Sequence, residues 1–327
     1  MLTYRQGPEQ DPFSYIYSSK QWLVSYDPPR KFPFWLNIEP TNACQLNCLF
    51  CSRQLSQRPI GFLDPKLADE IFQEAAGYEG AAVRFTGWGE PLLHPKIDLL
   101  AEKAKKADLK LKIYTNGLAL TEKLMDCFIQ VGVDDLQFSF QGLTPEQYAF
   151  NRVGSDYRIL EKNIIMASEK RGRAAKPFLS ILTSVLADEL AAADPVAFTD
   201  RWLDLVDKVA VDLTNLNFVS SLERVAPHLA SQSDGLRRGP CVDVFLALEI
   251  KYDGSVQFCG QDSKGLLEHT IGHLSQMTIA EAWLGSRMEA QRNLVGRGLG
   301  HEASPVCCNC FHNTDKYDLF KKLAQKD

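Results

Sequence analysis

Short apolar runs alternate with helix-start signals along most of this 327-residue chain, and this alternation constrains the fold more than any other feature. The runs have the length and composition of buried strands. They cover residues 34–38, 82–86, 111–114, 136–140, 179–185 and 213–219. Capping side chains precede the helices expected between them, at Asp64, Thr121, Thr144 and Asp194. Six strand–helix units with buried strands predict an α/β fold in which a parallel sheet forms a partial (β/α)6, TIM-like barrel.

The pattern changes near residue 220. Two apolar runs, 247–250 and 255–258, flank Asp253-Gly254 and predict a β-hairpin. Thr278 and Glu281 form a capping box that begins a helix ending at about residue 293. We therefore expect an N-terminal irregular lead-in over 1–32, the partial barrel over 33–220 and a small C-terminal α+β domain over 221–327. A last helix is expected over 315–325.

Three cysteines lie close together directly after the first predicted strand. Cys44, Cys48 and Cys51 have the spacing C-x3-C-x2-C. Three thiolates on a tight loop can ligate three irons of a 4Fe–4S cluster and leave the fourth iron open to another ligand. An electron-transfer ferredoxin saturates its cluster with four cysteines, and a structural zinc site also needs a fourth ligand. The sequence near Cys51 contains no further His or Cys that could supply one.

This motif, placed after the first strand, resembles the cluster-binding motif of the radical S-adenosylmethionine (SAM) superfamily. One strand later, Gly87-Trp88-Gly89-Glu90 is similar to the Gly-Gly-Glu-Pro motif of that family, with Trp88 between the two glycines. The resemblance implies that the open iron binds the amino and carboxylate groups of SAM. One-electron cleavage of SAM then yields a 5′-deoxyadenosyl radical. The resemblance also implies that Phe50 lies near the adenine and that Glu90 accepts a hydrogen bond from the methionyl ammonium.

Residues at later strand ends are further candidates, because ligands of barrel proteins bind at the carboxyl ends of the strands. By resemblance, Ser139 and Arg152 hold the SAM carboxylate, and Asn116 contacts the ribose or the substrate. Two of these residues also have a purely structural interpretation. Asn116-Gly117 is a common turn sequence, and Arg152 fits the surface of a helix.

Four more cysteines follow the barrel in a layout that resembles the twitch domain, a short form of the SPASM domain that carries one auxiliary 4Fe–4S cluster. They are Cys241, Cys259, Cys307 and Cys310. Their spacing alone fits a zinc ribbon equally well. Cys308 either replaces Cys307 as a ligand or is a free thiol near the cluster.

The resemblance implies a radical SAM enzyme, most readily an oxidoreductase, with three possible reactions. Aminocyclitol dehydrogenase-type members remove a carbinol hydrogen from a small hydroxylated molecule, and the auxiliary cluster accepts the second electron. We favour such a polyol or sugar substrate over a peptide. Many peptide-modifying members carry a further domain of about eighty residues, and some thirty residues precede the first strand here. The alternatives are radical epimerisation of a sugar or aminoglycoside, with Cys308 as the tentative hydrogen donor, and radical modification of a peptide or protein.

Charge and hydropathy restrict the partners and the compartment. Lys and Arg number 36 against 41 Asp and Glu, a net charge of −5 that argues against nucleic acid as the main partner. The sequence has no apolar run long enough to span a bilayer, and its first twenty residues lack the features of a signal peptide. We expect a cytoplasmic protein without a membrane partner. The resemblance adds an external electron donor such as flavodoxin or ferredoxin.

Overall fold

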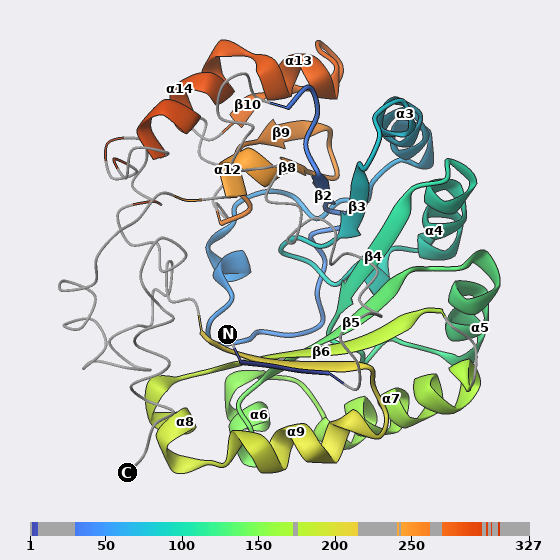
Figure 1. Cartoon of the computed structure of the whole chain (residues 1–327), viewed down its shortest axis with the longest axis vertical. Coiled ribbons are helices and arrows are strands. Elements are labelled where there is room, and N and C mark those ends of the chain that lie inside the picture. Colours follow the sequence, from blue (N-terminus) through green and yellow to red (C-terminus); the bar gives the residue numbers. More distant parts are fainter. Residues whose placement is uncertain are drawn as a thin grey trace.

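A single curved β-sheet runs through the protein (Figure 1). The computed structural model describes residues 2–5, 30–172, 176–214, 241, 243–261, 270–295, 299, 302 and 307. The ten strands lie in the order β1-β7-β6-β5-β4-β3-β2-β8-β9-β10. They are β1 (Leu2–Arg5), β2 (Trp35–Ile38), β3 (Ala82–Phe85), β4 (Lys110–Thr115), β5 (Asp135–Gln141), β6 (Phe178–Val185), β7 (Lys208–Leu213), β8 (Ala247–Ile250), β9 (Ser255–Gln257) and β10 (Thr270–His273). Strands β2 to β7 pair in parallel, which confirms the partial barrel.

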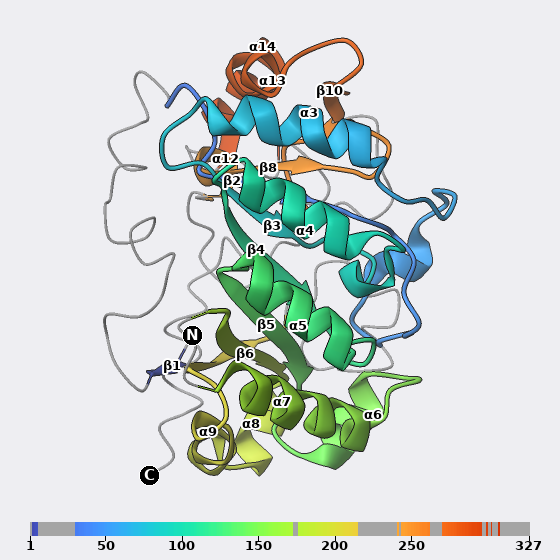
Figure 2. The same cartoon turned by 90° about the vertical axis from the view of Figure 1, so that its right-hand side faces the viewer.

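The longer helices of the barrel cover the convex side of this sheet (Figures 1 and 2). The barrel helices are η1 (Ser52–Leu55), α3 (Pro65–Ala76), η2 (Pro91–Leu93), α4 (Ile97–Lys106), α5 (Glu122–Val131), α6 (Pro145–Asn151), α7 (Tyr157–Arg171), α8 (Ala187–Ala192) and α9 (Pro195–Leu203). The main core lies between these helices and the strands, where Ile38, Phe85 and Phe138 are fully buried. Within the described part of the chain, no helix is both long enough and apolar enough to cross a membrane.

The four predicted helix starts are confirmed. The side chains of Asp64, Thr121, Thr144 and Asp194 each accept a hydrogen bond from a backbone N–H in the first turn of the following helix. Such caps satisfy N–H groups that have no partner within the helix, so these short polar side chains decide where the helices of the barrel begin.

Three elements differ from the predictions. The last described barrel strand is β7 at Lys208–Leu213, earlier than the predicted 213–219, because its apolar run Val209–Val211 is short and lies between Lys208 and Asp212. Residues 215–219 lie outside the described residues. The lead-in is not wholly irregular, since β1 pairs antiparallel with β7. The helix predicted to end near residue 293 is two helices, α13 (Ile279–Leu284) and α14 (Ser286–Val295), because Gly285 adopts an extended conformation. The helix expected over 315–325 lies outside the described residues.

The C-terminal α+β part extends the barrel sheet directly. β8 pairs in parallel with β2 and continues into the predicted hairpin with β9, which turns at Gly254 (φ 88°). The short helix α12 (Asp243–Leu246) leads into β8. The carboxylate of Glu74 in α3 accepts hydrogen bonds of 2.9 Å from the first two N–H groups of α13, which anchors this part against the barrel. The predicted boundary at residue 220 remains a prediction.

Candidate active site

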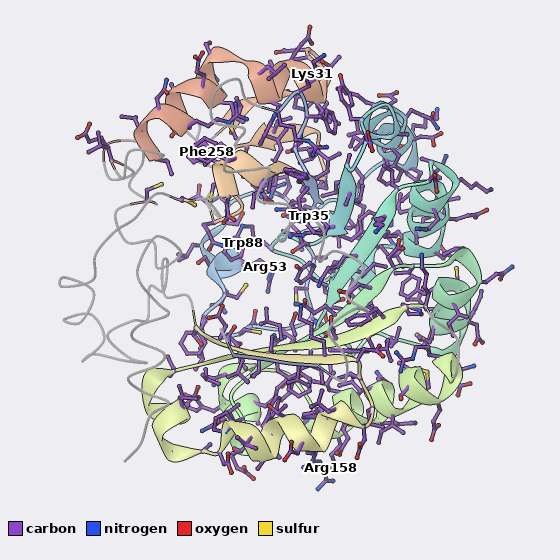
Figure 3. All side chains as sticks on the ribbon, viewed as in Figure 1. Lys31, Trp35, Arg53, Trp88, Arg158 and Phe258 are labelled. Carbon is purple, nitrogen blue, oxygen red and sulfur yellow. The ribbon has the colours of Figure 1, made fainter. Side chains whose placement is uncertain are left out.

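A cavity of about 320 Å³ lies on the concave side of the sheet, at the carboxyl ends of the barrel strands. Every barrel residue predicted to bind a cofactor or a cluster lines it. They are Phe50, Gly87, Trp88, Gly89, Glu90, Asn116, Ser139 and Arg152, with Cys44, Cys48 and Cys51. Figure 3 shows Arg53 and Trp88 on this concave side, whereas Arg158 points outward from the helical layer. The fold therefore brings together motifs that are up to about a hundred residues apart, as barrel topology predicts.

The cysteine loop is held by hydrogen bonds to the segment between α6 and α7. The backbone N–H groups of Asn47 and Leu49 donate to the carbonyl oxygens of Val153 and Asn151, each at 2.9 Å. The Arg53 guanidinium donates to the Leu46 carbonyl at 2.9 Å. These contacts fix the backbone between the cysteines, so the thiols lie on a defined loop.

The three thiols of the cysteine loop line the cavity and are partly buried. Burial raises the pKa of the Cys44 thiol to about 11, which the Leu46 amide only partly offsets, and burial also raises the pKa of Cys48 and of Cys51. Such thiols become thiolates when positive charge is supplied, as by iron. Across the described residues, no three His, Cys, Asp or Glu side chains converge closely enough to hold one metal ion. In a 4Fe–4S cluster each iron takes one thiolate, so Cys44, Cys48 and Cys51 could hold three of the four irons.

The Gly87-Trp88-Gly89 turn depends on its two glycines for different reasons. Gly87 has a φ of 128°, and a Cβ there would lie 2.8 Å from Cγ of Glu39. Gly89 lies against the loop before the cysteines, where a Cβ would come within 2.0 Å of the Thr41 carbonyl oxygen. The Glu90 N–H donates to the Ala43 carbonyl at 2.8 Å. The turn thus contacts the cysteine loop through its backbone.

Glu90 is a buried carboxylate, 2% exposed, that connects the turn to the end of β4. It accepts hydrogen bonds from the Thr115 hydroxyl (2.6 Å), the backbone N–H of Asn116 (2.7 Å) and the backbone N–H of Leu92 (3.1 Å). Burial raises the pKa of Glu90 despite these donors. A carboxylate offers about four acceptor positions, so one remains for a ligand in the cavity. Glu90 therefore organises the site as well as lining it.

Asn116 is a turn residue and also lines the cavity. It follows β4 in a turn, and its side-chain oxygen accepts from Gln45 (3.1 Å) and from the Leu118 amide (3.0 Å), while the side chain also lines the cavity. Arg152 is only 9% exposed, so its interpretation as a helix-surface residue is wrong. The positive charge of Arg152 lowers the pKa of Cys48, against the larger effect of burial.

Sequence analysis missed several residues of the site. Glu39 contacts the Gly87-Trp88 turn across a long separation in sequence, for which no motif exists, and Arg53 contacts the Leu46 carbonyl within the cysteine loop. The strand ends also contribute Tyr114, Gln141 and Ser184. Their signal is the alternation of side chains along each strand, which assigns every second residue to the concave side.

The C-terminal cysteines are only partly described. Cys307 is buried, 7% exposed, and Cys241 and Cys259 pack against the same core. Cys308 and Cys310 lie outside the described residues. The composition of the predicted auxiliary cluster site therefore remains a prediction.

The close approach of Gly89 to Thr41 generates a test. We expect Gly89→Ala to lower the free energy of unfolding by about 1–3 kcal/mol, since the added methyl group has no room against a backbone carbonyl. The variant should also retain less iron at the cysteine loop after anaerobic reconstitution, because Thr41–Ala43 must move. Chemical denaturation and iron analysis measure both effects. Gly77→Ala is the control, because Gly77 has an ordinary helical φ of −72°. Equal stability and iron content in both variants would contradict this geometry.

Comparison with known proteins identifies both parts of the chain. Residues 38–188 match the radical SAM superfamily, and residues 241–311 match the SPASM iron–sulfur cluster-binding domain. The chain is 32% identical over 114 residues to the tungsten-containing aldehyde ferredoxin oxidoreductase cofactor-modifying protein of Pyrococcus furiosus, a match that covers 35% of this chain and 32% of the relative. It is 32% identical over 113 residues to the PqqA peptide cyclase of Gluconobacter oxydans, covering 34% and 31%. The matches thus span about a third of the length of these curated relatives.

Solved structures show the same fold over most of the chain. BtrN in complex with AdoMet and 2-DOIA has a TM-score of 0.59 at 18% identity, with 86% of this chain and 94% of that chain covered. Streptococcus suis SuiB bound to the precursor peptide SuiA has a TM-score of 0.62 at 14% identity, with 93% and 76% covered. The two matched domains imply SAM, a SAM-binding 4Fe–4S cluster and an auxiliary cluster. The chain is therefore a radical SAM protein with a C-terminal SPASM/twitch domain.

Proposed function

We propose that the protein is an oxidoreductase that cleaves SAM reductively and removes a hydrogen atom from its substrate. One observation carries this proposal: the three thiols of the cysteine loop and the Gly87–Glu90 turn line a single cavity. A cluster held by three cysteines has an open iron, and the neighbouring turn offers a carboxylate acceptor beside it. When bound, the cluster and SAM supply a 5′-deoxyadenosyl radical.

The side chains around the cavity suit the groups of SAM. The unused acceptor position of Glu90 suits the methionyl ammonium, and Arg152 with Ser139 suits the methionyl carboxylate through charge-assisted hydrogen bonds. Phe50 offers an apolar surface to the adenine, and Asn116 is placed for the ribose or the substrate. These assignments explain why ionic and aromatic side chains share one cavity wall.

A small hydroxylated molecule, of the polyol or sugar type, is our first choice of substrate. Thr86, Gln141 and Ser184 add uncharged donors and acceptors to the cavity wall, and such groups suit hydroxyls. Dehydrogenation would remove one hydrogen as an atom and one as a proton, with the second electron passing to the auxiliary site.

Peptide modification is the second candidate function. Two PqqA peptide cyclases are among the curated relatives, at 32% and 30% identity over about a third of their length. Epimerisation of a sugar is a further route and needs a thiol that returns hydrogen to carbon. Cys308 is the candidate donor for that route.

Iron content and SAM cleavage test the enzyme class. We expect anaerobically reconstituted protein to hold about eight irons, in two 4Fe–4S clusters, and to form 5′-deoxyadenosine from SAM and dithionite. Combined replacement of Cys44, Cys48 and Cys51 by Ala should halve the iron and abolish 5′-deoxyadenosine. Cys127→Ala is the matched control, because this cysteine lies in helix α5 and does not line the cavity. Tightly bound zinc in place of the second cluster would overturn the auxiliary-cluster assignment.

Turnover in deuterated water distinguishes oxidation of the substrate from epimerisation. Candidate polyols, sugars and peptides are incubated with SAM and dithionite, and the products are analysed by mass spectrometry. Oxidation predicts a product lighter by two hydrogen atoms with no deuterium on the reacting carbon, and Cys308→Ala should still turn over. Carbon-bound deuterium in the wild-type product, lost in Cys308→Ala, would instead show epimerisation. Turnover of peptides alone would replace the small-molecule assignment.

A further inference from the structure

The hairpin of the C-terminal part contacts the segment that follows the cysteine loop. The Tyr252 hydroxyl, in the β8–β9 turn, donates a 2.7 Å hydrogen bond to the Pro59 carbonyl. The ring lies so close to Gly61 that a Cβ there would be 2.0 Å from the ring atom Cε2. Tyr252 therefore fixes the backbone of residues 59–61 from outside the barrel.

The same backbone segment is connected to the residues immediately before Cys44. The Asn42 amide donates to the Pro59 carbonyl at 2.8 Å, and its oxygen accepts from the Gly61 N–H at 2.9 Å. The Thr41 hydroxyl donates to the Gly61 carbonyl at 2.7 Å. A displacement of residues 59–61 must therefore displace the start of the cysteine loop.

A second set of contacts leads from Tyr252 to the glycine turn. The Arg58 guanidinium lies 4.8 Å from the centre of the Tyr252 ring, and its Nη2 is 2.8 Å from Oε1 of Glu39. Glu39 is 1% exposed, and its other oxygen accepts from the Trp88 N–H at 3.4 Å. Trp88 lines the cavity. Tyr252 is thus connected to both segments that would hold SAM and its cluster. Residues 59–61 connect it to the cysteine loop, and Arg58 with Glu39 connects it to the Gly87–Glu90 turn.

We propose that Tyr252 is a positioning residue through which the C-terminal domain sets the affinity of the barrel for SAM. The inference rests on the proposed function, since it assigns a role at the same cavity. Tyr252 itself does not line the cavity, so it acts through Arg58, Glu39 and residues 59–61.

The domain interface does not depend on Tyr252. Glu74 caps α13, and the Trp283 indole donates to the Arg30 carbonyl at 2.7 Å, at a separate part of the interface. Loss of the Tyr252 ring should therefore leave the C-terminal part docked while it releases residues 59–61 and the Arg58–Glu39 pair. This separates a positioning role from a general role in folding.

The test compares SAM binding and turnover in Tyr252→Leu, Tyr252→Phe and wild type, all reconstituted with clusters. We expect Tyr252→Leu to raise the SAM Kd and KM about tenfold, with a smaller change in kcat for 5′-deoxyadenosine formation. Tyr252→Phe retains the ring against Gly61 and Arg58 and loses the hydrogen bond, so a rise of about threefold is expected. Arg58→Met combined with Tyr252→Leu should weaken SAM binding by less than the product of the two single effects, because the two residues share the contact with Glu39, whereas the contact with residues 59–61 belongs to Tyr252 alone.

Tyr78→Leu is the matched control. Tyr78 stacks on Phe32 at 4.2 Å between ring centroids and takes no part in the cavity, so its loss should lower thermal stability without changing the SAM Kd. An unchanged SAM Kd in Tyr252→Leu, or equal decreases in SAM affinity for Tyr252→Leu and Tyr78→Leu, would overturn the positioning role. If wild-type protein itself neither binds nor cleaves SAM, the proposed function fails instead.

Discussion

Strand β2 pairs in parallel with β3 on one side and with β8 on the other, and the candidate site depends on this double pairing. Parallel strands end at the same edge of a sheet, so the segments after β2, β3 and β8 meet there. These segments carry Cys44, the Gly87–Glu90 turn and Tyr252. A register shift of one residue in β2 would exchange its two faces and would turn Glu39 away from the concave side.

Strands β4, β5 and β6 also carry a buried polar cluster. Lys112 and Asp135 form a buried ion pair at 2.6 Å, and the Ser180 hydroxyl donates to the same carboxylate at 2.7 Å. Burial alone would lower the pKa of Lys112, but the charge of Asp135 outweighs this effect and raises the pKa above its ordinary value. This ion pair joins β4 to β5, and neither of its residues lines the cavity. Removing either partner would leave a buried charge without compensation.

The sequence predicts those parts of the molecule that depend on local signals. Helix caps such as Asp64 and Thr121, the hairpin at Asp253-Gly254 and the cysteine spacing each have a short-range physical cause, and the structure contains them. Parallel topology then brings the strand ends together, which is why the predicted barrel residues line one cavity. The residues that sequence analysis missed act over long separations. The contacts of Arg58 with Glu39 and Tyr252 join residues far apart in the sequence, so they can be recognised only in the folded structure.

The most direct test of the account is the electron paramagnetic resonance spectrum of the dithionite-reduced, cluster-loaded protein before and after SAM is added. The cluster proposed for Cys44, Cys48 and Cys51 has an open iron in the cavity, so SAM should bind that iron and change the spectrum of this cluster. The signal of the auxiliary cluster, at a separate site, should not change. Spectra that superimpose with and without saturating SAM would contradict the assignment of this cavity as the SAM-binding site.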